Sequence, residues 1–72
     1  MKKIKKIKIK LNGKSKIIKG NYKIKDLIRD LKIPIKKVAI ELNQEILDKK
    51  KLSKINIKNN DKIEIVHFIG GG

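Results

Sequence analysis

The first part of the chain alternates apolar residues with lysines. Residues 6–11 carry an apolar side chain at every second position, which is the pattern of a half-buried strand. Asn12-Gly13 follows, and because both residues tolerate a positive φ, the pair predicts a tight hairpin turn. We expect residues 16–19 to form the return strand and Gly20-Asn21 to end it.

The spacing of apolar residues changes after residue 23 and predicts a helix that ends near Lys32. One helical stripe is formed by Ile24, Leu27, Ile28 and Leu31. Asp26, Arg29 and Asp30 lie on the other face, close enough for local charge pairing. Asn21 is the nearest good N-cap residue, and no capping box follows it. Pro34 prevents the helix from continuing.

The second half of the chain predicts three more strands. They are residues 38–42, a short partner at 45–47 after the turn Asn43-Gln44, and residues 62–69 after a tight turn at 59–61. The polar stretch 49–60 is expected to be a connection with one helical turn.

This order of elements predicts an α+β domain. One helix must cover one face of a mixed sheet of four to five strands, because no other segment is long enough to do so. The domain is expected to span residues 1–69, with residues 70–72 as a flexible tail. The predicted core comprises Ile7, Ile9, Leu27, Ile28, Leu31, Val38, Ile40, Ile63 and Ile65.

The net charge of +14 suggests nucleic acid or an anionic membrane surface as a partner. However, Arg29 is the only arginine, and Tyr22 and Phe68 are the only aromatic residues. Base-reading proteins favour arginine, and single-strand binders favour aromatic platforms. Lysine, isoleucine and asparagine make up 42 of 72 residues, and all three have A/T-rich codons. We therefore expect coding bias, dispersed lysines, and no specific nucleic-acid or membrane partner; a small basic nucleic-acid-binding module is the alternative.

Few residues are suited to catalysis or metal binding. Cysteine is absent and His67 is the only histidine, so we expect no metal site, no bound cofactor and no catalytic residue. The seven acidic residues fall at positions expected to be exposed and far apart, and Ser15 and Ser53 have no predicted base. The lysine-rich start lacks the apolar segment of a signal peptide, so a reducing intracellular compartment is expected.

The last predicted strand has two distinct faces. Ile63, Ile65, His67 and Ile69 would share one face, and Glu64, Val66 and Phe68 the other. Val66 and Phe68 would then form an apolar docking surface beside the tail. The other interpretation is that Phe68 packs at the end of the sheet, and the pattern alone does not decide between them.

The strand runs directly into Gly70, Gly71 and Gly72. Glycine has no Cβ, so an extended triglycine can enter a channel too narrow for side chains. At ~3.3–3.6 Å per residue it reaches roughly 10 Å beyond the fold. The reactive group would be the α-carboxylate of Gly72, activated by another enzyme, while Gly70 and Gly71 supply clearance. The other interpretation is a simple flexible end.

These features together resemble the ThiS family, the ubiquitin-like β-grasp sulfur carriers of thiamin biosynthesis. The matching segments are residues 11–13, 24–31, 38–46 and 61–72. Two turns depart from the family pattern: Asn60 stands where the family usually has glycine, and Asp48-Lys49 follows Leu47 where a Pro-basic pair is common. Asparagine is the next most tolerant residue for positive φ.

The resemblance implies a carrier rather than an enzyme. A ThiF-like adenylyltransferase would use ATP, as its own substrate, to join AMP to the Gly72 carboxylate. A sulfur donor protein would convert the acyl-adenylate to a thiocarboxylate, and a ThiG-like thiazole synthase would take the sulfur. The implied compartment is a bacterial cytoplasm or a plastid stroma. A MoaD-like small subunit of molybdopterin synthase has a similar tail and is the alternative carrier.

Overall fold

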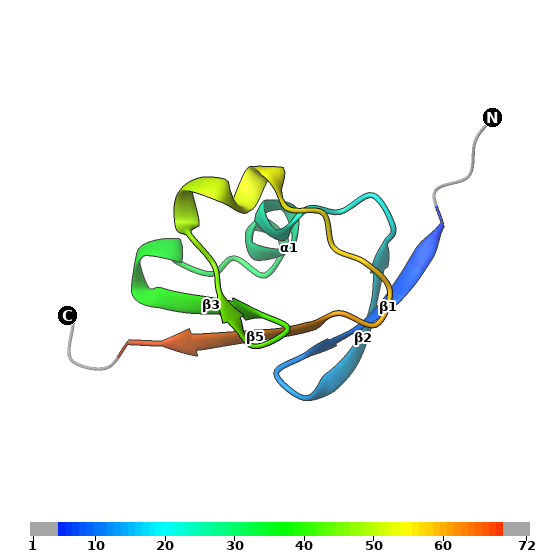
Figure 1. The fold of residues 1–72 in the computed structure, drawn as a ribbon, viewed down its shortest axis with the longest axis horizontal. Helices are drawn as coiled ribbons and strands as arrows, with labels where there is room; N and C mark the ends of the chain where they lie inside the picture. Colours follow the sequence, from blue (N-terminus) through cyan, green and yellow to red (C-terminus); the bar gives the residue numbers. More distant parts are fainter. Residues whose placement is uncertain (1–4, 69–72) are drawn as a thin grey trace.

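The structure, a computed structural model, describes residues 5–68, which form a five-stranded mixed sheet with its helices on one face (Figure 1). The elements are β1 (Lys6–Leu11), β2 (Lys14–Lys19), α1 (Ile24–Asp30), η1 (Ile35–Lys37), β3 (Val38–Leu42), β4 (Glu45–Ile46), η2 (Lys49–Lys54) and β5 (Lys62–His67). The strand order is β2-β1-β5-β3-β4, with β1 and β5 parallel and the other pairs antiparallel. The predicted α+β architecture is therefore confirmed.

The β1–β2 hairpin forms where the sequence predicts it. Asn12 and Gly13 have φ values of 50° and 82°, as the tight turn requires. The return strand begins earlier than predicted, at Lys14, because a two-residue turn pairs Leu11 directly with that residue. At the other end, a Cβ on Gly20 would lie 2.6 Å from the Lys5 carbonyl oxygen, so only glycine fits there.

Helix α1 begins differently from the sequence-based expectation. Lys23, not Asn21, is the N-cap, and its side chain makes no capping hydrogen bond. The Asp26 carboxylate accepts a hydrogen bond from the Lys23 N–H at 2.9 Å, which is the return half of a capping box. Arg29 pairs with Asp26 at 3.2 Å and with Asp30 at 3.4 Å, which confirms the predicted local charge pairing.

The helix ends before Pro34 through a residue in the left-handed region. Lys32 has φ 56°, and the Ile33 N–H donates to the Ile28 carbonyl at 3.3 Å. This is the 6→1 hydrogen bond that characterises a Schellman motif at a helix C-terminus. The chain therefore turns away from the helix axis, and Pro34 then precedes η1.

The core lies between the sheet and the helical layer. Seven of the nine predicted core residues are buried, while Ile7 and Leu31 are only half-buried. Four further buried residues are Ile18, Ile24, Leu52 and Ile57. Leu52 and Ile57 belong to the polar connection, which folds back on the start of α1: the Ile57 N–H donates to the Tyr22 carbonyl at 2.9 Å. This contact is long-range, so local periodicity gave no sign of it.

Strand β5 occupies the centre of the sheet (Figure 1). It pairs along one edge with β3, from Leu42 opposite Ile63 to Val38 opposite His67. It pairs along the other edge with β1, where Leu11 lies beside Ile63. Both edges of this strand are therefore bonded, and its register is fixed from two sides.

The side chain of Asn12 extends the β1–β5 pairing beyond the end of β1. Its Oδ1 accepts from the Ile65 N–H at 2.7 Å, and its Nδ2 donates to the Ile65 carbonyl at 3.4 Å. The Asn12 N–H also donates to the Ile63 carbonyl at 2.9 Å. Asn12 thus shapes the hairpin turn and holds β5 in register.

Asn43 likewise holds the start of β5, from the β3 side of the sheet. It lies in the second turn with φ 50°, and its Oδ1 accepts from the Lys62 N–H at 2.9 Å. Its Nδ2 donates to the Asp61 carboxylate at 3.0 Å, and Asp61 also accepts from the Lys58 N–H at 2.8 Å. Asn60, between these groups, has φ 72°, as expected for a residue that replaces glycine.

Truncating the helix core should destabilise the domain. Leu27 is buried beneath α1, so Leu27→Ala should lower the free energy of unfolding by about 2–5 kcal/mol, measured by urea denaturation. Ile46→Ala is the matched control, since this side chain is 76% exposed and its loss should cost under about 0.5 kcal/mol. Equal costs for the two variants would contradict the assignment of Leu27 to the core.

The Asn12 side chain offers a separate test of how β5 is held. Asn12→Gly keeps the positive φ but leaves the Ile65 N–H without its partner, so we expect a loss of about 1–3 kcal/mol. Asn12→Asp keeps the acceptor and should lose less. Urea denaturation of both variants gives the comparison. Two variants as stable as the parent would show that this amide does not hold the strand.

Candidate functional site

The chain reaches its C-terminal glycines through β5 and Phe68. The strand ends at His67, shorter than predicted, because β3 begins at Val38 and offers no strand partner beyond it. The Phe68 N–H instead donates to the Lys37 carbonyl of η1 at 2.8 Å. The backbone is thus anchored up to Phe68. Ile69, Gly70, Gly71 and Gly72 lie outside the described residues, so the sequence-based expectations for the tail stay predictions.

The side chains of β5 alternate as predicted between the helical side and the open face. Ile63 and Ile65 are buried, whereas Val66 and Phe68 are 52% and 51% exposed. The Phe68 ring is therefore not buried at the end of the sheet, and its role in docking stays a prediction. Its ring lies 5.2 Å from the Lys49 Nζ, a cation–π contact at the protein surface.

A further apolar residue extends this surface and was missed by sequence analysis. Ile46 in β4 lies opposite Glu41, which lies opposite Glu64, so all three share the open face with Val66. Ile46 is 76% exposed. A two-residue strand has no alternation to reveal which way its side chains point. We call Ile46, Val66 and Phe68 the open-face patch.

Charge is distributed unevenly over the open face. Lys6, Lys8 and Lys10 of β1 are exposed and alternate with the residues that point toward the core. On the β3–β5 side, Glu41 and Glu64 face each other directly, and no lysine belongs to β3 or β4. Lys62 at the start of β5 alternates with the buried residues in the same phase as Glu64, and Lys49 lies against Phe68, so lysines border the open-face patch as well. Every lysine within residues 5–68 is exposed.

The remaining candidate residues lie on separate elements. Ser15 lies on β2, Ser53 in η2 and His67 on β5, and all three are exposed. Within residues 5–68 no three His, Asp or Glu side chains come together as a metal site. The expectation that every acid is exposed is wrong for Asp26, Glu41 and Asp61, which are half-buried. Asp26 and Asp61 are drawn inward by their hydrogen bonds to backbone N–H groups.

None of the helices between residues 5 and 68 has the length and apolar character needed to cross a membrane.

Comparison with known proteins gives one consistent family. The model of the ThiS family matches residues 9–72. The sulfur carrier protein ThiS of Bacillus subtilis (strain 168) is 40% identical over 65 residues, which are 89% of this chain and 98% of that protein. The thiamine biosynthesis protein ThiS from Geobacter metallireducens has a similar crystal structure, with TM-score 0.81, 28% identity, and coverage of 92% of this chain and 100% of that one.

A longer protein matches as well. The thiazole synthase of Paramagnetospirillum magneticum (strain ATCC 700264 / AMB-1) is 35% identical over 66 residues. Those residues are 92% of this chain but 20% of that protein, so the chain spans about a fifth of this relative's length. Since the family model covers nearly all of the chain and the Bacillus protein is matched over almost its full length, the chain belongs to the ThiS family of sulfur carriers of thiamin biosynthesis and has their ubiquitin-like β-grasp fold.

Proposed function

We propose that the chain carries sulfur as a thiocarboxylate on Gly72 and presents it on the triglycine tail. The observation that supports this most directly is the anchoring of the preceding residues. Strand β5 is bonded along both edges, and Phe68 is held by Lys37, so the tail leaves the domain from a fixed point. Residues 70–72 bring no side chain that would block a narrow channel.

The chemistry needs an activating enzyme. A carboxylate is a poor electrophile, so the Gly72 carboxylate oxygen first attacks the α-phosphorus of ATP and releases pyrophosphate. Sulfide supplied by the donor then attacks the carbonyl carbon of the acyl-adenylate, and AMP leaves with the former carboxylate oxygen. The product is the thiocarboxylate and one proton. ATP binds to a ThiF-like adenylyltransferase in this scheme, and the carrier holds no cofactor.

A ThiG-like thiazole synthase would be the acceptor of the sulfur. The relative from Paramagnetospirillum magneticum supports this partner, because a segment similar to this chain and a thiazole synthase share one polypeptide there. The family match likewise favours thiazole formation over the MoaD-like alternative and over a nucleic-acid-binding module.

We assign the docking of these enzymes to the open-face patch. Its three side chains are exposed: Val66 lies on β5, Phe68 follows the end of that strand, and Ile46 lies on β4. Exposed apolar residues gathered on one face of a small domain mark an interaction surface. A partner seated there would meet residues 70–72 one residue beyond Phe68.

Removing Gly72 should abolish sulfur loading without unfolding the domain, since residues 5–68 supply the core. The measurement is the mass of the protein after incubation with the cognate activating enzyme, ATP and sulfide. Gly71→Val should also block loading, through steric exclusion from the channel. His67→Ala is the control and should load normally, and all three should melt close to the parent temperature. A chain lacking Gly72 that still gains the sulfur would refute the proposal.

Docking can be separated from chemistry with variants of the open-face patch. Phe68→Asp and Ile46→Asp should each lower kcat/KM for adenylation at least about tenfold, mainly through KM, because they place a charge in the interface core. Lys25→Asp, an exposed substitution on α1, is the matched control. If both patch variants are adenylated as efficiently as this control, the activating enzyme docks elsewhere.

A further inference from the structure

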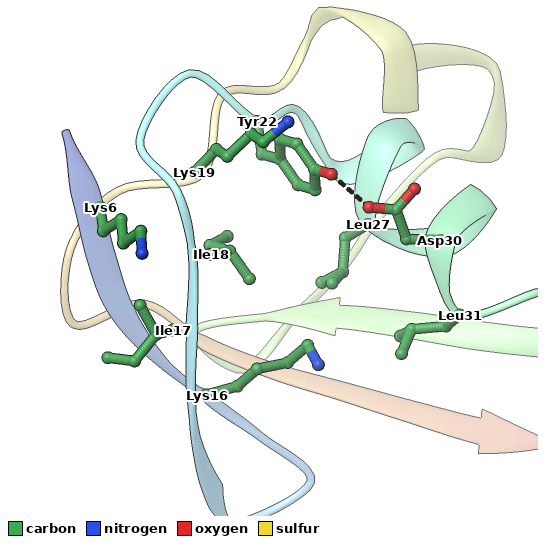
Figure 2. Close-up of a pocket in the computed structure, with 9 residues that line it drawn as sticks. All are labelled: Lys6, Lys16, Ile17, Ile18, Lys19, Tyr22, Leu27, Asp30 and Leu31. Carbon is green, nitrogen blue, oxygen red and sulfur yellow. Dashed lines mark hydrogen bonds between the residues drawn. The ribbon is translucent and has the colours of Figure 1, made fainter. Parts of the chain in front are cut away.

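A groove of about 400 Å³ lies between β2 and α1, on the helical side of the sheet (Figure 2). Its apolar floor comes from Ile18 of β2 and from Leu27 and Leu31 of the helical segment, and Ile17 lines the groove at the edge of β2. Ile18 and Leu27 are buried and Leu31 is half-buried, so the floor is continuous with the core. None of the residues that line the groove belongs to the open-face patch.

One end of the groove is bounded by a polar contact. The Tyr22 hydroxyl donates a hydrogen bond to the Asp30 carboxylate, which joins the loop after β2 to the end of α1 (Figure 2). This bond raises the pKa of Tyr22 and lowers the pKa of Asp30. Tyr22 is therefore a neutral donor and Asp30 an acceptor at neutral pH, and the acid is already engaged by Tyr22 and Arg29.

The other wall of the groove is a free sheet edge. Strand β2 is the outermost strand, with β1 as its only neighbour among the described strands. The Gly20 N–H donates to the Lys5 carbonyl at the open end of the hairpin. Hydrogen-bonded and non-hydrogen-bonded pairs alternate in an antiparallel ladder, so Ile18 and Lys16 are bonded to β1. The backbone N–H and C=O groups of the alternate residues of β2 then point away from β1.

These backbone N–H and C=O groups of β2 provide hydrogen-bonding positions for one further strand. Ser15, Ile17 and Lys19 direct their backbone away from β1, and only the Lys19 carbonyl has a bond within the described chain, from the Tyr22 N–H at 3.2 Å. Ile17 is 58% exposed, so an apolar side chain stands beside the free groups on the open face. An added strand would pair with Ser15 and Ile17, point one set of side chains into the groove, and cover Ile17 with the other.

The positive charge around the groove favours an acidic segment as the added strand. Lys6, Lys16 and Lys19 line it, and Figure 2 shows their side chains around its mouth. Asp30 is the one acid in the lining, and it is already paired. A second copy of this chain would bring another set of lysines to the same edge, which disfavours self-pairing. An acidic segment would instead find complementary charge.

We propose that this groove is a second docking site, which takes an extended acidic segment of a partner protein as an added strand on β2. Backbone bonds to Ser15 and Ile17 would supply affinity, an apolar side chain would fill the space over Ile18 and Leu27, and flanking acids would meet the lysines. The site uses neither the tail nor the open-face patch. A partner bound here therefore leaves Gly72 free for its enzymes.

The test is a titration of the ¹⁵N-labelled full chain with a probe peptide, acetyl-Glu-Glu-Val-Ile-Val-Ile-Glu-amide, at up to about 1 mM. The amides of Ser15, Ile17 and Lys19 should shift and exchange their hydrogens at least about tenfold more slowly when bound. The amides of Val66 and Phe68 should not move. The same peptide with proline at its central position is the control, and it should not bind, because proline cannot donate to the ladder.

Two pairs of variants separate strand addition from general attraction. Ile17→Pro removes an outward N–H without touching the bonds to β1, whereas Ile17→Thr keeps that N–H. The first should weaken binding at least about tenfold relative to the second. Lys16→Glu/Lys19→Glu should weaken it by a similar factor, and Lys54→Glu/Lys58→Glu, with the same change in net charge, should have a smaller effect. The charge variants keep the test decisive if the proline variant does not fold.

Several outcomes would overturn the proposal. Shifts centred on Val66 and Phe68, or equal binding of the proline-containing peptide, would show that the peptide does not add to β2. If the two charge-reversal variants lose the same amount of affinity for the peptide, the attraction depends on net charge and not on the lysines of the groove. The same β2 shifts with inorganic pyrophosphate alone, or with a single-stranded oligonucleotide, would make the groove a general anion site rather than a peptide site.

Discussion

The structure depends on the position of β5 in the middle of the sheet. A strand bonded along both edges cannot slip by one residue without exposing Ile63 and Ile65 and losing every ladder bond at once. Asn12 and Asn43 reinforce this from either side, because each places a side-chain amide against the β5 backbone. The fixed register decides which side chains face outward and where the chain leaves the domain.

A carrier needs this arrangement for a physical reason. In the function that we propose, its last residues enter the channel of another enzyme, and a mobile attachment point would add to the entropy cost of binding. Here the Phe68 backbone is held by Lys37, and the open-face patch lies on β5, on β4 and at Phe68 itself. Docking by the patch would therefore position the tail without a separate recognition step.

The two edges of the sheet differ in character, and this difference keeps the two proposed surfaces apart. The β4 edge lies beside the open-face patch and Glu41, whereas the β2 edge carries lysines and borders the groove with α1. Since β1 and β5 separate β2 from β3, a partner on one side does not occupy the other.

Much of this protein is determined by its sequence. Alternating apolar residues specify β1, β3 and β5, the stripe from Ile24 to Leu31 specifies α1, and Asn12-Gly13 specifies the first turn, because each is a local pattern set by backbone geometry. Alternation also placed Ile63 and Ile65 on the buried side of β5 and Glu64 and Val66 on its exposed side, whereas the surroundings of Phe68 could not be read from the pattern.

Contacts between residues far apart in the sequence determine the features that local patterns did not predict. Ile57 and Leu52 are buried only because the polar connection folds back on α1, and Asn12 bonds a residue 53 positions away. Helix α1 has Lys23 rather than Asn21 as its N-cap because the Asp26 carboxylate accepts a hydrogen bond from the Lys23 N–H. Ile46 joins the patch through a two-residue strand, and the groove exists only where β2 meets α1. A sequence pattern reports which face of an element is apolar, but the partner that covers that face, or leaves it open, is set by packing between distant segments.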